Sequence, residues 1–175
     1  MRQSKGTLII GGPFGVPIYL HWSILLGGLL PTPWVGFGAL ELLYFTIGYF
    51  ILIAVHEFGH VFAANKVGLK VLAVEMSIAG GLCRYEFPSS IGSALFVTSA
   101  GLLAQLLLLI VSMIYSSILS GETGTISSCL LLIFTFINVC MFVVNILPIK
   151  VLSGLSTDGL LLWKLSTIYV KSYFH

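Results

Sequence analysis

The sequence predicts an all-α, polytopic integral membrane protein with about four transmembrane helices and a small membrane-associated β-hairpin. Of its 175 residues, 58% are hydrophobic and only 8% are charged, whereas about 25% of the residues in a soluble domain are charged. Four long apolar segments follow one another, and none has the single polar face of a soluble helix. The length suits one domain over residues 1–175. A net charge of +2 is too small to indicate a nucleic-acid partner.

The four apolar segments are the predicted spans. A transmembrane helix needs about 20 residues, so the first segment is short, and Pro17 and His21 interrupt it. We interpret it as a retained span because no small-residue cleavage site follows it. The hairpin is predicted between the second and third spans, where two β-prone runs flank Gly80 and Gly81. The predicted spans are residues 17–30, 38–65, 93–116 and 126–147, and a final helix over 160–174 is predicted to lie on the membrane surface.

The basic residues indicate how these spans are oriented. With four crossings, the N-terminus, the 66–92 loop and the C-terminal tail share one side, which then holds all eight Lys and Arg residues. The other side holds Glu41 and Glu122 and no basic residue. The positive-inside rule makes the basic side cytoplasmic. We therefore expect a multi-pass protein of the cell (plasma) membrane, embedded in the lipid bilayer, with both termini in the cytoplasm.

The second predicted span ends in the stretch Ala54-Val-His-Glu-Phe-Gly-His-Val-Phe62, which places three ionisable side chains in an apolar helix. Such groups are costly inside a membrane and therefore indicate function. Residues four apart lie on one face of a helix. His56 and His60 can therefore bind one zinc ion, while Glu57 acts as a general base on a water molecule that the metal activates. The alternative is a chance match in which neighbouring helices satisfy the histidines.

A third metal ligand is expected from elsewhere in the chain, because a catalytic zinc usually has three protein ligands and one open position. Asp158 is the main candidate, since it follows the fourth span in Asn145-Ile-Leu-Pro148 and Thr157-Asp-Gly159. Pro148 ends or kinks the helix, and Gly159 lets the chain turn a carboxylate back towards the bilayer. The other candidates on the same predicted side are Glu75, Glu86 and the terminal His175, of which the two glutamates fit solvated loop charges better.

Taken in order, these motifs resemble the site-2 protease family of intramembrane zinc metalloproteases. The HEFGH stretch, the Asn145-x-x-Pro148 pair and the Asp158-Gly159 pair carry the resemblance. Two further segments are similar to family features: residues 15–23 to the entry of the first helix, and residues 99–105 to an Ala-Gly-Pro-x-x-Asn segment. Gly80 and Gly81 fall at the Gly-Gly turn of the family's membrane-associated hairpin.

The resemblance implies a zinc endopeptidase that hydrolyses peptide bonds within or next to transmembrane segments of a signalling protein or a small membrane peptide. It implies that His56, His60 and Asp158 hold Zn²⁺ and that Glu57 is catalytic. Asn145, Gly80 and Gly81 are then expected to support the site or to bind substrate. A strand edge of the hairpin is expected either to hold an unwound substrate by strand addition or to be a plain surface hairpin. The alternative functions are a catalytically inactive membrane scaffold and a metal transporter.

The chain also departs from the family pattern. Leu102 and Gln105 stand where the family usually has Pro and Asn, and the thirteen-residue step from Asn145 to Asp158 is longer than the usual spacing. We interpret the extra Ser-, Gly- and Thr-rich residues as a flexible loop that still lets Asp158 reach the metal. His21 is interpreted as a structural hydrogen-bonding residue. The three cysteines match no zinc or redox motif and are interpreted as apolar fillers.

Overall fold

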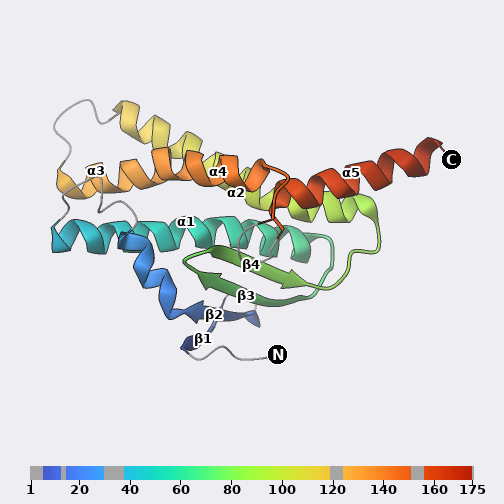
Figure 1. Cartoon of the computed structure of the whole chain (residues 1–175), viewed down its shortest axis with the longest axis horizontal. Coiled ribbons are helices and arrows are strands. Elements are labelled where there is room, and N and C mark those ends of the chain that lie inside the picture. Colours follow the sequence, from blue (N-terminus) through green and yellow to red (C-terminus); the bar gives the residue numbers. More distant parts are fainter. Residues whose placement is uncertain (1–5, 13–14, 30–37, 119–123, 151–155, 175) are drawn as a thin grey trace.

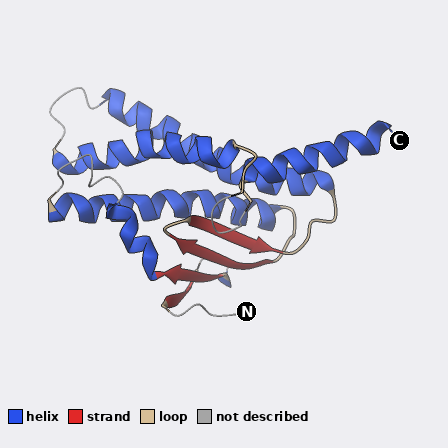
Figure 2. Cartoon of the chain, in the orientation of Figure 1, coloured by secondary structure: helices blue, strands red, loops and turns tan. Residues whose placement is uncertain are grey.

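A computed structural model describes residues 6–12, 15–29, 38–118, 124–150 and 156–174. Long helices run side by side, and a small sheet lies against one side of them (Figure 1). Figure 2 shows that helices make up most of the chain. The protein is therefore mostly helical with a small sheet, rather than all-α. The terminal His175 lies outside the described residues.

Three helices in the described part of the chain are long and apolar enough to cross a membrane. Helices α1 and α2 have 28 residues each, and at 1.5 Å per residue such a helix is about 42 Å long, which exceeds a hydrocarbon core of roughly 30 Å. The third candidate span runs from α3 through the π-helical turn η3 into α4. The bounds are Ala39–Lys66 for α1, Ile91–Ile118 for α2, Thr125–Leu132 for α3, Ile133–Ile137 for η3 and Asn138–Ile146 for α4.

The sheet has four strands in the order β1-β2-β3-β4. Strands β1 and β2 pair antiparallel, as do β3 and β4, whereas β2 and β3 pair in parallel. The hairpin of β3 and β4 lies between α1 and α2 in the sequence, and Gly80 and Gly81 open its second strand. Strand β4 is an outer strand of the sheet. The bounds are Thr7–Gly11 for β1, Pro17–His21 for β2, Val71–Ser77 for β3 and Gly80–Tyr85 for β4.

The first predicted span, residues 17–30, is wrong as a transmembrane helix. Its first residues form β2, in which Tyr19 pairs with Glu75 of β3, and the next residues form the 3-10 helix η2, Trp22–Leu29. A Pro is tolerated as the first residue of a strand, and pairing with β3 satisfies the backbone groups of this segment. The segment is too short to cross a bilayer as a helix, and its first five residues join the sheet instead.

The turn between β3 and β4 is held against η2 and α1. The hydroxyl oxygen of Ser23 accepts a hydrogen bond from the backbone N–H of Ile78 at 3.2 Å. The hydroxyl of Tyr49 on α1 donates to the carbonyl of the same Ile78 at 3.0 Å. Nδ1 of His21 lies 2.7 Å from Oγ of Ser23, which agrees with a structural role for His21. These contacts fix the start of β4 beside the middle of α1.

The main apolar core lies between α1 and the sheet. Ile53 and Val61 of α1 and Val74 and Met76 of β3 belong to one buried cluster. Helix α2 packs on α1, and both are packed against the third span. Because the sheet, α2 and the third span surround α1, its polar residues His56, Glu57 and His60 are buried.

The last helix, α5, covers Asp158–Phe174 and packs on α2 at its beginning. It then runs away from the other helices towards the C-terminus (Figure 1). Trp163 and Ile168 are exposed along it, so apolar side chains cover part of its free surface. The position of α5 at the membrane surface stays a prediction.

Candidate metal centre

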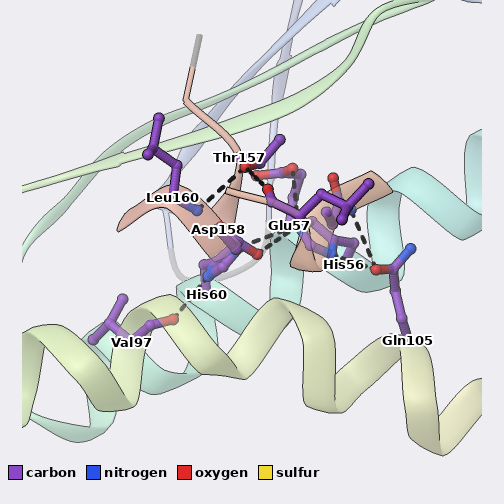
Figure 3. Close-up of polar contacts among 10 residues, drawn as sticks. His56, Glu57, His60, Val97, Gln105, Thr157, Asp158 and Leu160 are labelled. Carbon is purple, nitrogen blue, oxygen red and sulfur yellow. Dashed lines mark hydrogen bonds and ion pairs between the residues drawn. The ribbon is translucent and has the colours of Figure 1, made fainter. Parts of the chain in front are cut away.

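Two helices bring three metal-binding side chains to one point. His56 and His60 lie one turn apart on α1, and their Nε2 atoms are 3.2 Å apart. Asp158, the first residue of α5, places Oδ2 3.3 Å from each of these nitrogens. Figure 3 shows the three side chains converging between the ribbons of α1 and α5. The three residues that the sequence predicts as ligands are therefore close enough to hold one metal ion.

The outer nitrogens of both imidazoles face oxygen acceptors. Nδ1 of His60 lies 2.8 Å from the backbone carbonyl oxygen of Val97, and Nδ1 of His56 lies 3.0 Å from Oε1 of Gln105, both on α2 (Figure 3). A carbonyl oxygen can only accept a hydrogen bond, so Nδ1 donates. In a neutral imidazole this leaves the lone pair on Nε2, which points at the common centre. Metal-binding histidines usually have such an outer partner.

The chemistry of the three groups fits a zinc ion. Two neutral imidazole nitrogens and one carboxylate oxygen form a ligand set that zinc accepts. Burial alone would raise the pKa of the Asp158 carboxyl, but the two imidazoles beside it outweigh burial and lower that pKa to about 2. Asp158 is therefore a carboxylate at neutral pH. The three converging electron pairs would repel one another unless a cation or a proton lies between them.

Glu57 lies next to this centre and is almost completely buried, with 2% of its surface exposed. Its Oε1 is 4.0 Å from Nε2 of His56, and its carboxylate accepts a hydrogen bond from the backbone N–H of Cys83 on β4. A Cβ atom at Gly81 would lie 2.3 Å from Oε1 of Glu57, so only a glycine at this position leaves room for the carboxylate. Among the described residues, Oε2 of Glu57 has no hydrogen-bond partner.

Thr157 fixes the position of Asp158 despite the long step from Asn145. Its hydroxyl donates to backbone carbonyls at the end of the third span, those of Leu147 and Ile149. The same oxygen accepts the N–H of Leu160 at 3.3 Å, which is the N-cap contact of α5 (Figure 3). Lys150 and Ser156 form an isolated bridge just before it. Most of the extra residues, 151–155, lie outside the described residues, but the residues on either side of them are paired, and α5 begins at Asp158 two residues after Ser156.

Gly159 allows α5 to begin against the end of α4. A Cβ atom at this position would lie 1.9 Å from the backbone carbonyl oxygen of Ile146, and backbone atoms cannot move aside cheaply. We expect Gly159→Ala to displace Asp158, to destabilise the fold by about 1–3 kcal/mol as overpacking does, and to weaken metal binding. Thermal unfolding and zinc titration of the purified protein would measure both effects. Gly92→Ala on α2 is the control, since its Cβ atom would meet only Ser90 Oγ at 4.0 Å; equal behaviour of the two variants would contradict the prediction.

The other candidate ligands lie elsewhere. Oε1 of Glu75 on β3 accepts a hydrogen bond from Nε of Arg84 on β4 at 2.7 Å, and both side chains are at the surface. Glu86 is exposed after the end of β4. Neither glutamate belongs to the cluster that Asp158 completes with the two histidines.

A cleft of about 340 Å³ opens beside the three ligands and Glu57. Residues from Ala79 to Cys83 form one wall, and Asn145 lies in the lining with its Nδ2 donating to Oε1 of Gln105 at 3.3 Å. Gly80 and Gly81 thus lie in the wall of the cleft, as does Asn145. All seven residues that the sequence singled out as site residues border this one cleft.

Two residues at the site had no role assigned from the sequence. Gln105 was noted only as a departure from the family's Asn, and Thr157 only as part of a flexible loop. The signal for Gln105 was available, because it is an amide in the middle of an apolar span. The signal for Thr157 was the Thr-Asp-Gly order itself, because a Thr directly before an acidic residue is a common start of a helix.

Comparison with known proteins agrees with this fold. No protein-family model and no curated protein sequence matches the chain. Among solved structures, a site-2 protease from Methanocaldococcus jannaschii is similar, with a TM-score of 0.68 and 21% sequence identity over 95% of this chain and 73% of that chain. The chain has the fold of a site-2 protease. The identity is low, so the site-2 protease fold is what the likeness shows, and the chemistry depends on the side chains described above.

Proposed function

We propose that the chain is an intramembrane zinc metalloprotease that hydrolyses peptide bonds within or next to transmembrane segments of a signalling protein or a small membrane peptide. One observation carries the proposal. Nε2 of His56, Nε2 of His60 and Oδ2 of Asp158 converge beside the buried carboxylate of Glu57 at the wall of a cleft. The helix that supplies three of these four residues is long and apolar enough to cross a membrane, and the site-2 protease fold supports the same function.

The two histidines and Asp158 would hold zinc through three positions and leave a fourth position open. When bound, zinc acts as a Lewis acid that polarises the scissile carbonyl and makes a water molecule more acidic. Glu57 is the group that takes the proton of the attacking water and passes it to the nitrogen that leaves as the C–N bond breaks. Its Oε2 has no competing hydrogen-bond partner among the described residues, while the carboxylate accepts a hydrogen bond from the backbone of Cys83 and borders the cleft.

The substrate must reach this site in an extended form, because the hydrogen bonds of a helix shield its peptide bonds. Strand β4 is an outer strand, and its residues Gly80–Cys83 line the cleft. An unwound substrate segment that pairs with this strand would present its backbone to Glu57. Asn145 lines the same cleft and offers an amide to the substrate backbone.

This function can be tested by comparing membrane peptides from two kinds of cell. One carries the parent protein and the other carries Glu57→Gln. We expect cleaved membrane peptides that occur only with the parent. Identical peptide profiles, together with normal folding of both proteins, would favour the inactive scaffold instead.

We also propose that both termini and the 66–92 loop lie in the cytoplasm. Strands β1 and β2 share a sheet with β3 and β4, which belong to that loop, and Asp158 meets the C-terminal half of α1. Because the three helical spans alone would put the two termini on opposite sides, this orientation requires a further crossing, without a regular transmembrane helix, between β2 and α1. Single cysteines placed at Ser4, Thr32, Ser89 and Gly121 in a cysteine-free background would be labelled in intact cells. Reagents confined to the outside are expected to reach positions 32 and 121 only, and all four after permeabilisation. Labelling of position 4 from outside would overturn this orientation.

A further inference from the structure

Gln105 of α2 joins two parts of the site through one atom. Its side chain is completely buried, with 0% of its surface exposed. Oε1 lies 3.0 Å from Nδ1 of His56 on α1 and 3.3 Å from Nδ2 of Asn145 on α4. A candidate metal ligand and a residue of the cleft lining, which come from different helices, therefore share one amide oxygen.

The contact of Oε1 with Nδ1 determines which nitrogen of His56 is free to bind a metal. An amide oxygen accepts hydrogen bonds and cannot donate, so His56 donates from Nδ1 and keeps the lone pair on Nε2. His60 has the same arrangement through the carbonyl oxygen of Val97. Helix α2 thus supplies the outer acceptor for both imidazoles, once from its backbone and once from the side chain of Gln105.

The surroundings of Gln105 indicate that packing alone does not explain why a glutamine occupies this position. Its Nε2 atom is buried and has no hydrogen-bond partner among the described residues, which is costly for an amide. Leu or Met would fill a similar volume without this cost. The backbone around it is also tied to the third span, since Nδ2 of the buried Asn138 donates to the carbonyl oxygen of Gln105 at 3.0 Å. Asn138 directly follows the π-helical turn η3, a feature that often marks functional positions in helices.

We propose that Gln105 is a positioning residue that holds His56 with its Nε2 lone pair towards the metal and, through the same oxygen, holds the amide of Asn145 at the wall of the cleft. This inference rests on the proposed function, because it assigns Gln105 to the same metal site. It predicts that metal affinity depends on an acceptor oxygen at position 105, whatever substrate the protein cuts.

Zinc and cobalt binding to purified protein in detergent tests the proposal without a substrate. We expect Gln105→Leu, which has no acceptor, to lower zinc affinity by about 10–100-fold in competition with a chelator, as loss of an outer partner of a metal-binding histidine typically does. Gln105→Glu keeps an acceptor oxygen and is expected to bind zinc as tightly as the parent. The visible absorption spectrum of the Co²⁺-loaded protein is expected to change in Gln105→Leu and to stay parent-like in Gln105→Glu.

Two further variants separate positioning from general stability. Ser112→Ala removes a buried hydroxyl two turns along α2 that donates only to the carbonyl of Leu108 in its own helix, and it is expected to leave zinc affinity and the cobalt spectrum unchanged. Asn145→Ala leaves the contact between Gln105 and His56 in place, so its zinc affinity is also expected to stay parent-like. If Gln105→Leu does not fold, Gln105→Met takes its place.

Unchanged zinc affinity and an unchanged cobalt spectrum in Gln105→Leu, or equal losses in Gln105→Leu and Gln105→Glu, would overturn the positioning role. These results differ from a failure of the proposed metal site, in which the parent protein itself would bind neither zinc nor cobalt and His56→Ala would behave like the parent. They also differ from a failure of proteolysis alone, in which the parent would bind zinc but cut no membrane peptide.

Discussion

Glu57→Gln is expected to keep its zinc and to lose almost all proteolysis, because a glutamine cannot accept the proton of the attacking water. Loss of a general base of this kind typically lowers the rate by about 10²–10⁴-fold. Zinc content is expected to stay normal, since Glu57 lies outside the cluster of His56, His60 and Asp158. The glutamine keeps a similar shape beside Gly81 and still offers an oxygen to the backbone N–H of Cys83. Proteolysis of a membrane peptide and metal analysis of the same preparation would measure both properties.

Glu86→Gln is the matched control for this variant, because Glu86 is an exposed carboxylate just after β4 and does not line the cleft. It is expected to cut and to bind zinc as the parent does. Proteolysis at the parent level in Glu57→Gln would show that another group supplies the base. Loss of zinc in Glu57→Gln would instead make Glu57 a metal ligand.

The local features of the fold and site could be predicted from the sequence. The long uncharged runs predict membrane helices, and three of them occur near the expected residues. The four-residue spacing of His56 and His60 puts both on one face of a helix whatever surrounds it. Two β-prone runs about Gly80 and Gly81 also predict strands without information from distant residues, and the structure has β3 and β4 there.

The first apolar segment could not be assigned in this way. Residues 17–21 form a strand because they pair with β3, whose residues come more than fifty positions later. Hydrophobicity alone does not separate a short buried strand from part of a buried helix. The charge argument for a fourth crossing concerned only which side residues lie on, and the sheet places the N-terminal strands beside the 66–92 loop without a helical span.

The remaining features of the site depend on contacts between helices. The length of the step from Asn145 to Asp158 gives no information about where its ends lie, and only the structure shows that Thr157 ties the end of this step to the carbonyls of Leu147 and Ile149. The contact of Gln105 with His56 likewise requires the packing of α2 on α1. Such contacts follow from how the helices pack and cannot be read from spacing along the chain.

Asp158→Ala is expected to lower zinc occupancy and proteolysis together, in contrast to Glu57→Gln. Removing the carboxylate leaves the two imidazoles of His56 and His60, which is one ligand short of the usual three at a catalytic zinc site. The loss of affinity is expected to be at least the roughly 10–100-fold that follows from losing an outer partner of a ligand, because Asp158 Oδ2 itself faces both Nε2 atoms. Metal analysis after dialysis against a weak chelator would measure it.

The controls are Glu75→Ala and Glu86→Ala, which remove the two other carboxylates that the sequence offered as third ligands. Both are expected to keep zinc, because Glu75 is paired with Arg84 and Glu86 is exposed. Full zinc in Asp158→Ala with a loss in either control would move the third ligand to the hairpin of β3 and β4. The comparison is decisive because Asp158 is held next to the histidines by hydrogen bonds of the Thr157 hydroxyl with the backbone of Leu147 and Leu160, which the substitution does not touch. A loss of zinc in Asp158→Ala would therefore come from the missing carboxylate and not from a displaced helix.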